Sequence, residues 1–141
     1  MYIPKHFKAY ELLPKDFYES HTIKGDQLWW MFDSRILITG DALRERYGKI
    51  LMNTWFWGGA HQYRGWRPFD CEIGAELSQH KFGRACDWEF VDVTAEEVRQ
   101  DIKKHPGQFP YVTCIEEGVS WLHGDCRNWD RNKHGILYVN P

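Results

Sequence analysis

The sequence lacks any apolar run of about 18 residues, the length at which a membrane-spanning helix is suspected. Its first eight residues also lack the apolar core of a secretory signal, so we expect a protein made in the cytoplasm without a signal peptide. The net charge of -2 gives no basic surface for nucleic acid. These absences argue against a membrane span and a nucleic-acid partner, and they leave the oligomeric state open.

The sequence also lacks cysteines in the CxxC spacing of a structural zinc knuckle. Its four cysteines are Cys71, Cys86, Cys114 and Cys126. In a protein made in the cytoplasm, such scattered cysteines are expected to be buried thiols and not a disulfide framework.

What is present suits one domain. The apolar fraction of 43% is enough to form a core. The length of 141 residues suits a single core and is too short for two. No internal repeat, low-complexity tract or linker interrupts it, so residues 1–141 are expected to form one unit. Aromatic residues reach 16%, with eight Trp, and several of them lie in Gly-rich or polar surroundings where they could line a groove.

The order of apolar patterns predicts an α+β fold. Helices are expected at residues 26–47, where Gly48 ends the periodic pattern, and at residues 94–104, where Thr94 and Glu97 form a capping box. Strands are expected at residues 49–57, 88–91, 112–115, 119–125 and 135–139. The irregular stretch 61–77 is too long for an ordinary loop of a compact domain, and this favours a functional role.

The segment Ser78–Asp87 carries the first candidate site residues. His80 and Asp87 stand seven positions apart, with Gly83 between them to permit a tight backbone and the small Ala85 to permit close packing. A single histidine of this kind is ordinarily a core or surface residue. Its company makes it a candidate ligand, because a loop followed by a strand lets ligands converge from separate elements.

The segment Glu117–Asp125 carries the second part of the candidate site. Strand alternation places Trp121, His123 and Asp125 on one face, so Asp125 could orient a ligand histidine. Otherwise Asp125 is a solvated carboxylate at a strand end. Glu117 lies in a Glu-Glu-Gly turn, which by itself indicates solvent exposure.

His80, Asp87 and His123 together are the ligand set of a catalytic zinc site, which has three protein ligands and an open position for water. Beside such a site, Glu117 is the available general base.

Arginine side chains supply candidate substrate contacts. Arg64 and Arg67 belong to the irregular loop, and a planar guanidinium binds a carboxylate through two hydrogen bonds. Arg84 is a further candidate that could equally brace its own loop, and Ser78 could donate a hydrogen bond at the loop's start. Arg64 and Arg67 could also be two solvated loop cations.

The pattern Ser78-x-His80-x-x-Gly83-Arg84-Ala85-x-Asp87, followed by Trp121-x-His123-x-Asp125, resembles the zinc D-Ala-D-Ala carboxypeptidase and L-alanyl-D-glutamate endopeptidase family. This family includes bacterial wall-trimming enzymes and phage endolysins, and it shares its fold with the Hedgehog signalling domain. The resemblance covers roughly Leu28 to Arg127. It implies zinc bound by His80, Asp87 and His123, and an antiparallel sheet that carries the zinc, with helices packed on its other face.

Within this resemblance, the sequence Gly65-Trp66-Arg67 is similar to a family loop whose arginine contacts the substrate or the reacting carbonyl. Many members have an acid three residues before the last histidine, where this chain has Ser120. The Hedgehog domain has its Glu six residues before that histidine, which corresponds to Glu117 here. The stretch Trp55–Tyr63 is extra length that could shape or obstruct the cleft.

The resemblance implies a metallopeptidase that hydrolyses D-amino-acid-containing peptides of bacterial peptidoglycan and acts at the cell wall if it comes from a phage. Glu117 is then the base, Arg67 stabilises the oxyanion or holds a substrate carboxylate, and Ser78, Arg84, Trp121 and Asp125 support the site or the substrate. The alternative is a catalytically inactive, zinc-stabilised structural or binding module, as in a phage particle, and the missing acid at position 120 favours it. The family includes both carboxypeptidases and endopeptidases, and the sequence does not choose between them.

Overall fold

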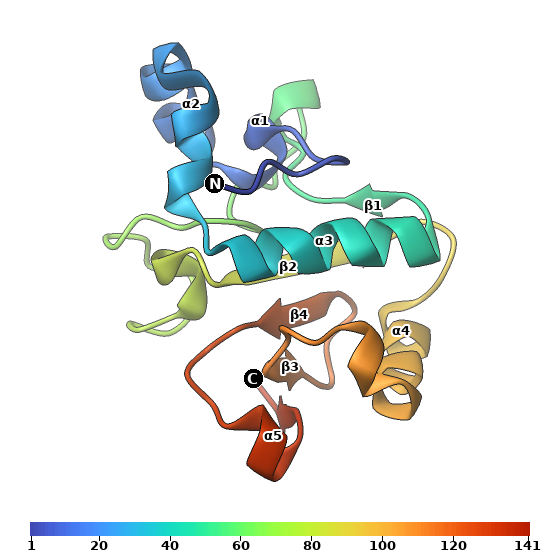
Figure 1. The fold of residues 1–141 in the computed structure, drawn as a ribbon. Coiled ribbons are helices and arrows are strands. Elements are labelled where there is room, and N and C mark those ends of the chain that lie inside the picture. Colours follow the sequence, from blue (N-terminus) through green and yellow to red (C-terminus); the bar gives the residue numbers. More distant parts are fainter.

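A computed structural model describes all residues 1–141 (Figure 1). The helices are α1 (Ala9–Leu12), α2 (Lys15–His21), α3 (Ser34–Tyr47), α4 (Ala95–Lys104) and α5 (Arg131–His134), with 3-10 turns η1 (Thr22–Met31), η2 (Trp55–Trp57), η3 (Gln79–Phe82) and η4 (Pro106–Gln108). The strands are β1 (Ile50–Leu51), β2 (Ala85–Phe90), β3 (Cys114–Glu116), β4 (Leu122–Asp125) and β5 (Leu137–Val139). The fold is therefore α+β, as predicted. No helix has both the length and the apolar character needed to cross a membrane.

The five strands form one sheet in the order β1-β2-β4-β3-β5. The pairs β1–β2, β2–β4 and β4–β3 are antiparallel, but β3 and β5 are parallel. The prediction of an antiparallel sheet is therefore wrong at this edge. After β4 the chain passes through α5 and reaches the far side of β3, where it runs against β4 and hence along β3.

Helices α3 and α4 pack against one face of the sheet. Trp88 of β2 is 1% exposed and shares a single core cluster with Leu37 of α3, Ile102 of α4 and Leu122 of β4. Gly40 of α3 lies against Trp88, since a Cβ there would lie 3.4 Å from Trp88 Nε1. Asp87, the neighbour of Trp88 in β2, consequently points to the opposite face.

The long helix begins later than predicted. Asp33 has an extended backbone and accepts a hydrogen bond from Arg35 N, so it caps α3, which starts at Ser34 and not near residue 26. Residues 22–31 form η1, which is kinked at Gly25, where φ is 54°. The capping box of Thr94 and Glu97 is present at the start of α4, as predicted.

The predicted strand at residues 49–57 is mostly wrong. Only Ile50 and Leu51 pair with β2, and residues 55–57 form the turn η2, which Gly58 ends in a left-handed conformation. Its alternating apolar pattern comes instead from aromatic packing outside the sheet, because the Phe56 ring stacks on Tyr10 with centroids 3.9 Å apart.

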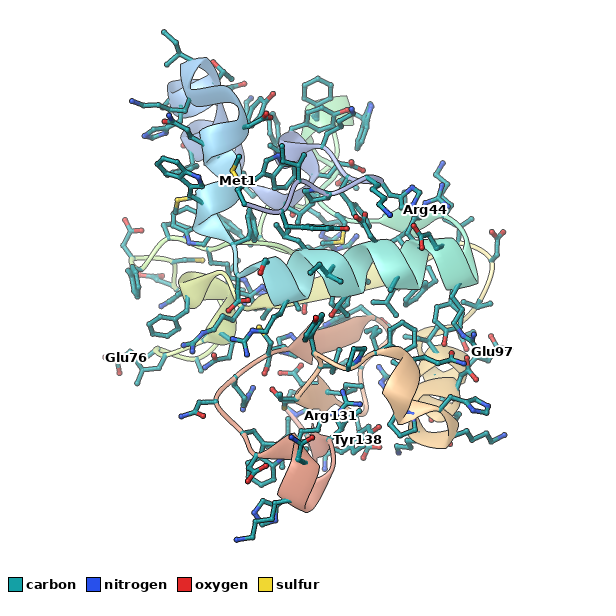
Figure 2. All side chains as sticks on the ribbon, in the orientation of Figure 1. Met1, Arg44, Glu76, Glu97, Arg131 and Tyr138 are labelled. Atoms are coloured by element: carbon teal, nitrogen blue, oxygen red, sulfur yellow. The ribbon has the colours of Figure 1, made fainter.

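Residues 58–78 contain no helix or strand, which confirms the irregular stretch predicted at residues 61–77. In Figure 2, Glu76 lies at the outer edge of this loop and points away from the sheet. All four cysteines are free, and Cys86, Cys114 and Cys126 are buried.

Candidate metal centre

Three elements bring the predicted ligands together. The antiparallel register of β2 and β4 pairs Asp87 with His123, so both side chains share the face of the sheet opposite α3. His80 comes from η3, the turn that immediately precedes β2. These three buried residues form the one group of His, Cys, Asp and Glu side chains in the chain that could hold a metal ion.

The three ligand atoms are close to tetrahedral spacing. His80 Nε2 lies 3.2 Å from His123 Nδ1, which lies 2.8 Å from Asp87 Oδ1, and the third distance, from His80 Nε2 to Asp87 Oδ1, is 3.3 Å. Around an ion with metal–ligand bonds of ~2.0–2.1 Å, tetrahedral ligands lie about 3.3 Å apart. The donors therefore need only small movements to accept an ion.

His80 is held by a backbone carbonyl behind it. Its Nδ1 lies 2.7 Å from the carbonyl oxygen of Gly65, so Nδ1 donates a hydrogen bond to that oxygen. The lone pair of Nε2 is then available to bind a metal. The position needs glycine, because a Cβ on residue 65 would lie 2.2 Å from the carbonyl oxygen of Leu12. The loop thus contributes a fixed acceptor that orients the first ligand.

His123 is held by a carboxylate in the same manner. Its Nε2 lies 3.3 Å from Oδ2 of Asp125, which is 0% exposed, and its Nδ1 faces His80 and Asp87. Arg127 donates to both oxygens of Asp125 and so fixes that carboxylate. Asp125 therefore has the orienting position that strand alternation predicts.

Arg67 holds the third ligand. Its Nη2 donates to Asp87 Oδ2 at 3.0 Å, which leaves Oδ1 directed at the two histidines. Its Nε donates to the carbonyl of Tyr63 and its Nη1 to that of Ile73, so every nitrogen of this guanidinium has a protein acceptor. Arg67 thus links the irregular loop to the ligand carboxylate.

Gly83 is required by the motif's backbone. Its φ is 67°, and a Cβ there would lie 1.9 Å from the carbonyl oxygen of Met31. Asp33 N donates to the carbonyl of Gly83, so the cap of α3 and the turn between the ligands are joined. Gly83 therefore permits the tight turn between His80 and Asp87 that the sequence predicts.

Mutual interactions set the charge states in the cluster. Burial lowers the pKa of His80, and this keeps its imidazole neutral. Burial also disfavours charge on His123, but hydrogen bonds to Asp125 and Asp87 outweigh it and raise the pKa to about 9. Burial raises the pKa of Asp87, yet electrostatic interactions and hydrogen bonds with His80 and His123 outweigh it and bring the pKa below its usual range. The carboxylate stays ionised, as a metal ligand must be.

A cleft of about 360 Å³ opens over this cluster. Its walls include the ligands, the predicted residues Arg67, Ser78 and Trp121, and two residues that the sequence did not single out, Glu116 and Arg127. The volume lies at the small end of ligand-binding pockets. The cleft suits a short segment of a ligand.

Glu116 is the carboxylate that the structure brings to the cleft. The β3–β4 register pairs Ile115 with Gly124, and one further step brings Glu116 opposite His123 on the same face. Its carboxylate accepts no hydrogen bond within the protein, although it lies near enough to His123 to influence its charge. The residues of the turn between β3 and β4 do not reveal this register in the sequence. Glu116 could have been identified only if the β3–β4 pairing were known, because side-chain alternation then puts it on the face of His123.

Glu117 is not in the cleft. Its carboxylate forms a salt bridge with Lys103 of α4, and the Glu117 side chain is 36% exposed. This geometry does not support the prediction of Glu117 as the base. Arg84 is also outside the cleft lining, since its guanidinium lies over the Phe82 ring at 4.9 Å. The structure thus favours the bracing role for Arg84.

Two other predicted positions lie elsewhere. Arg64 pairs with Glu89 at 2.8 Å and does not line the cleft. Ser120 is exposed and borders a different, larger hollow of about 520 Å³ beside α4 that contains none of the three ligands. The missing acid at Ser120 therefore leaves the metal cleft unaffected, and the size of a hollow does not mark the site in this protein.

Comparisons with protein-family models, with curated proteins and with solved structures find no match for this chain. What the site does must therefore be argued from its own geometry, together with the motif.

Proposed function

We propose that the protein is a zinc-dependent peptidase, with His80, Asp87 and His123 as the metal ligands. The observation that carries the proposal is the convergence of three donor atoms at the base of an open cleft, each fixed by a second partner. A buried group held this way has the form of a catalytic metal site with room for substrate. Two imidazoles and one carboxylate at near-tetrahedral spacing are a donor set that catalytic zinc sites use.

Zinc in this position supplies a Lewis acid that lowers the pKa of water toward ~7 and polarises a carbonyl. The protein's own part begins with Glu116. This free carboxylate, opposite His123, takes a proton from the attacking water and returns it to the leaving amine. It replaces Glu117 in the mechanism that we propose, because the Glu117 carboxylate is bonded to Lys103.

Arg67 acts on Asp87 in this proposal. Since all its nitrogens already donate to protein acceptors, it is a positioning residue that keeps Asp87 Oδ1 aimed at the histidines. The Arg67 side chain is only 10% exposed, so little of its guanidinium is open for the predicted roles in holding the oxyanion or the substrate.

The substrate proposal rests on the motif that Ser78–Asp87 and Trp121–Asp125 share with peptidoglycan peptidases. We propose the stem peptide of bacterial peptidoglycan, cleaved at a D-amino-acid-containing bond. Trp121 is 39% exposed at the cleft wall, where its ring can pack on a peptide. A phage-derived enzyme of this kind acts at the cell wall.

The test is release of free amino groups from purified peptidoglycan by the zinc-loaded protein, compared with Asp87→Asn and with protein treated with chelator. Cleavage that is lost in both controls and restored by zinc supports the proposal. Bound zinc without cleavage of any wall peptide would favour the alternative, a zinc-stabilised structural or binding module. Cleavage that persists in Asp87→Asn would exclude this cluster as the catalytic site.

A further inference from the structure

Arg127 differs from the other cation of the cleft. Arg67 is 10% exposed in its side chain, and its three nitrogens are all bonded within the protein. The side chain of Arg127 is 33% exposed, and its Nη1 has no acceptor in the protein. Both guanidiniums line the cleft, but only Arg127 has a terminal nitrogen without any acceptor in the protein, and its side chain is the more exposed of the two.

The free donor is held in a defined position. Nε and Nη2 of Arg127 donate hydrogen bonds to the Asp125 carboxylate, and the backbone N–H of residue 127 donates to the same carboxylate at 3.1 Å. Asp125 is in turn bonded to His123 Nε2. The guanidinium is therefore fixed beside the metal ligands on the sheet face that they share, and this lowers the entropy lost when it binds a ligand.

The charges of the cleft favour an anion. Counted over side chains, a divalent ion and the two guanidiniums face the carboxylates of Asp87, Asp125 and Glu116, which leaves one positive charge in excess. Arg127 has its one ion pair with Asp125, and Glu116 makes no ion pair. A ligand carboxylate would balance the excess.

We infer that Arg127 binds a carboxylate of the substrate and so makes this cleft selective for peptides that carry a free carboxylate next to the scissile bond. This inference rests on the proposed peptidase function and adds its specificity determinant. Charge-assisted hydrogen bonds from a fixed guanidinium are among the strongest polar contacts and favour a planar anion. The carboxylate is either the C-terminus of the peptide or the α-carboxyl of a γ-linked D-glutamyl residue.

The experiment uses matched acid and amide substrates. One pair is a wall-type peptide that ends in D-Ala-D-Ala, as the free acid and as the C-terminal amide. The other is L-Ala-γ-D-Glu-L-Lys with the D-glutamyl α-carboxyl free or amidated. The zinc-loaded wild type and Arg127→Gln are compared by kcat/KM on all four peptides. Arg46→Gln is the control, because Arg46 pairs with Asp101 away from the cleft.

We expect the wild type to prefer one acid over its amide by about 10²-fold, from the strength of such a bond, and Arg127→Gln to lose that preference. The pair that shows the preference identifies the source of the carboxylate. Because Arg127 also supports Asp125, the variant could slow all four peptides. The acid-to-amide ratio removes that common effect, and equal ratios in wild type and variant would overturn the inference.

Binding supplies a readout that does not depend on turnover. By calorimetry on the zinc-loaded protein, acetyl-D-Ala-D-Ala or L-Ala-γ-D-Glu should bind at least about tenfold more tightly than its amide, and Arg127→Gln should remove the difference. A wild type that cleaves acids and amides equally well refutes the role of Arg127 and leaves the peptidase standing. A wild type that binds the acid selectively but cleaves nothing refutes the peptidase and leaves the carboxylate site standing.

Discussion

Glu116 and Glu117 are neighbours in the chain, but their carboxylates lie on opposite sides of the sheet. Glu116 lines the metal cleft beside His123, whereas Glu117 is bonded to Lys103 of α4. Side chains alternate across a strand, so a shift of one residue exchanges the cleft for the helix side. In the proposed peptidase, this relationship decides which of the two carboxylates can act on the substrate.

The first prediction follows from this pair. Glu116→Gln should reduce kcat by about 10²-fold or more while zinc stays bound, because the amide cannot accept the proton of water. Glu117→Gln should leave the rate unchanged, since the contact that it loses is with Lys103 outside the cleft. Rates on peptidoglycan together with metal content test both variants. Equal losses in the two variants would contradict the assignment of Glu116.

The ligand set could be predicted from the sequence because each residue sits in a local pattern with its own physical reason. Gly83 marks the tight turn between His80 and Asp87, and alternation in β4 puts His123 and Asp125 on one face. These relationships span a few residues, so they need no knowledge of the tertiary structure. The structure brings the three ligands together, and the identity of the metal stays a prediction.

The base and the cleft cations could not be assigned in that way. Glu116 is identified only by the pairing of β3 with β4, and the turn between them hides the register. Arg67 looked like a substrate residue because its acceptors, the carbonyls of Tyr63 and Ile73, are loop atoms that no sequence pattern indicates. The parallel β5 likewise depends on the path of the chain through α5 and not on its own composition.

The second prediction concerns metal content. Purified wild type should contain about one zinc ion per chain, and His123→Ala should lose it, because a site that retains two of its three protein ligands binds far more weakly. His105→Ala is the matched control, since the His105 side chain is 54% exposed and is not part of the group formed by His80, Asp87 and His123. Mass spectrometry of the metal measures both. Zinc retained in His123→Ala, or absent from wild type after reloading, would refute the metal centre.

The third prediction concerns the residue behind the ligand. Asp125→Asn should weaken zinc binding by about 10- to 100-fold, because partners that orient a ligand histidine contribute to metal affinity by that amount. The substitution keeps the shape of the side chain but removes its charge next to His123 Nε2. Competition with a chromophoric chelator measures the affinity. An unchanged affinity would make Asp125 a residue of the fold alone.

The fourth prediction concerns thiol chemistry. Burial raises the pKa of Cys114 and of Cys126 to about 12, and it raises that of Cys86 as well. The thiolate is the reactive form, so at pH 8 a thiol reagent should label only Cys71 in the folded protein and all four cysteines after denaturation.

The same shifts give the sign of a pH effect. Above about pH 9 the unfolded chain releases thiol protons that the folded chain keeps, so the free energy of unfolding should decline as the pH rises toward 12. Denaturant titrations at pH 8 and pH 10 measure this, and Cys114→Ser reports one thiol's share of the decline. In the labelling experiment at pH 8, rapid reaction of any cysteine besides Cys71 in the folded protein would contradict the burial of Cys86, Cys114 and Cys126.

The last prediction concerns Arg99, which supports the cleft from the helix side. Arg99 of α4 is 2% exposed and donates to the carbonyl oxygens of Glu116, Val119 and Trp121. Arg99→Met keeps the apolar stem but removes the charged donor that these three carbonyls share, and we expect a loss of about 3 kcal/mol in the free energy of unfolding. Arg46→Met, which removes an exposed ion pair, should cost much less.

Arg99→Met should also separate two parts of the site. Arg99 contacts none of the three metal ligands, so zinc should remain bound in the folded variant. Two of the three carbonyls belong to Glu116 and Trp121, whose side chains line the cleft, so the rate should fall as that connection loosens. Denaturant midpoints, metal content and kcat together test this. If stability, zinc content and rate all matched the wild type, the connection between β3 and β4 would be held without Arg99.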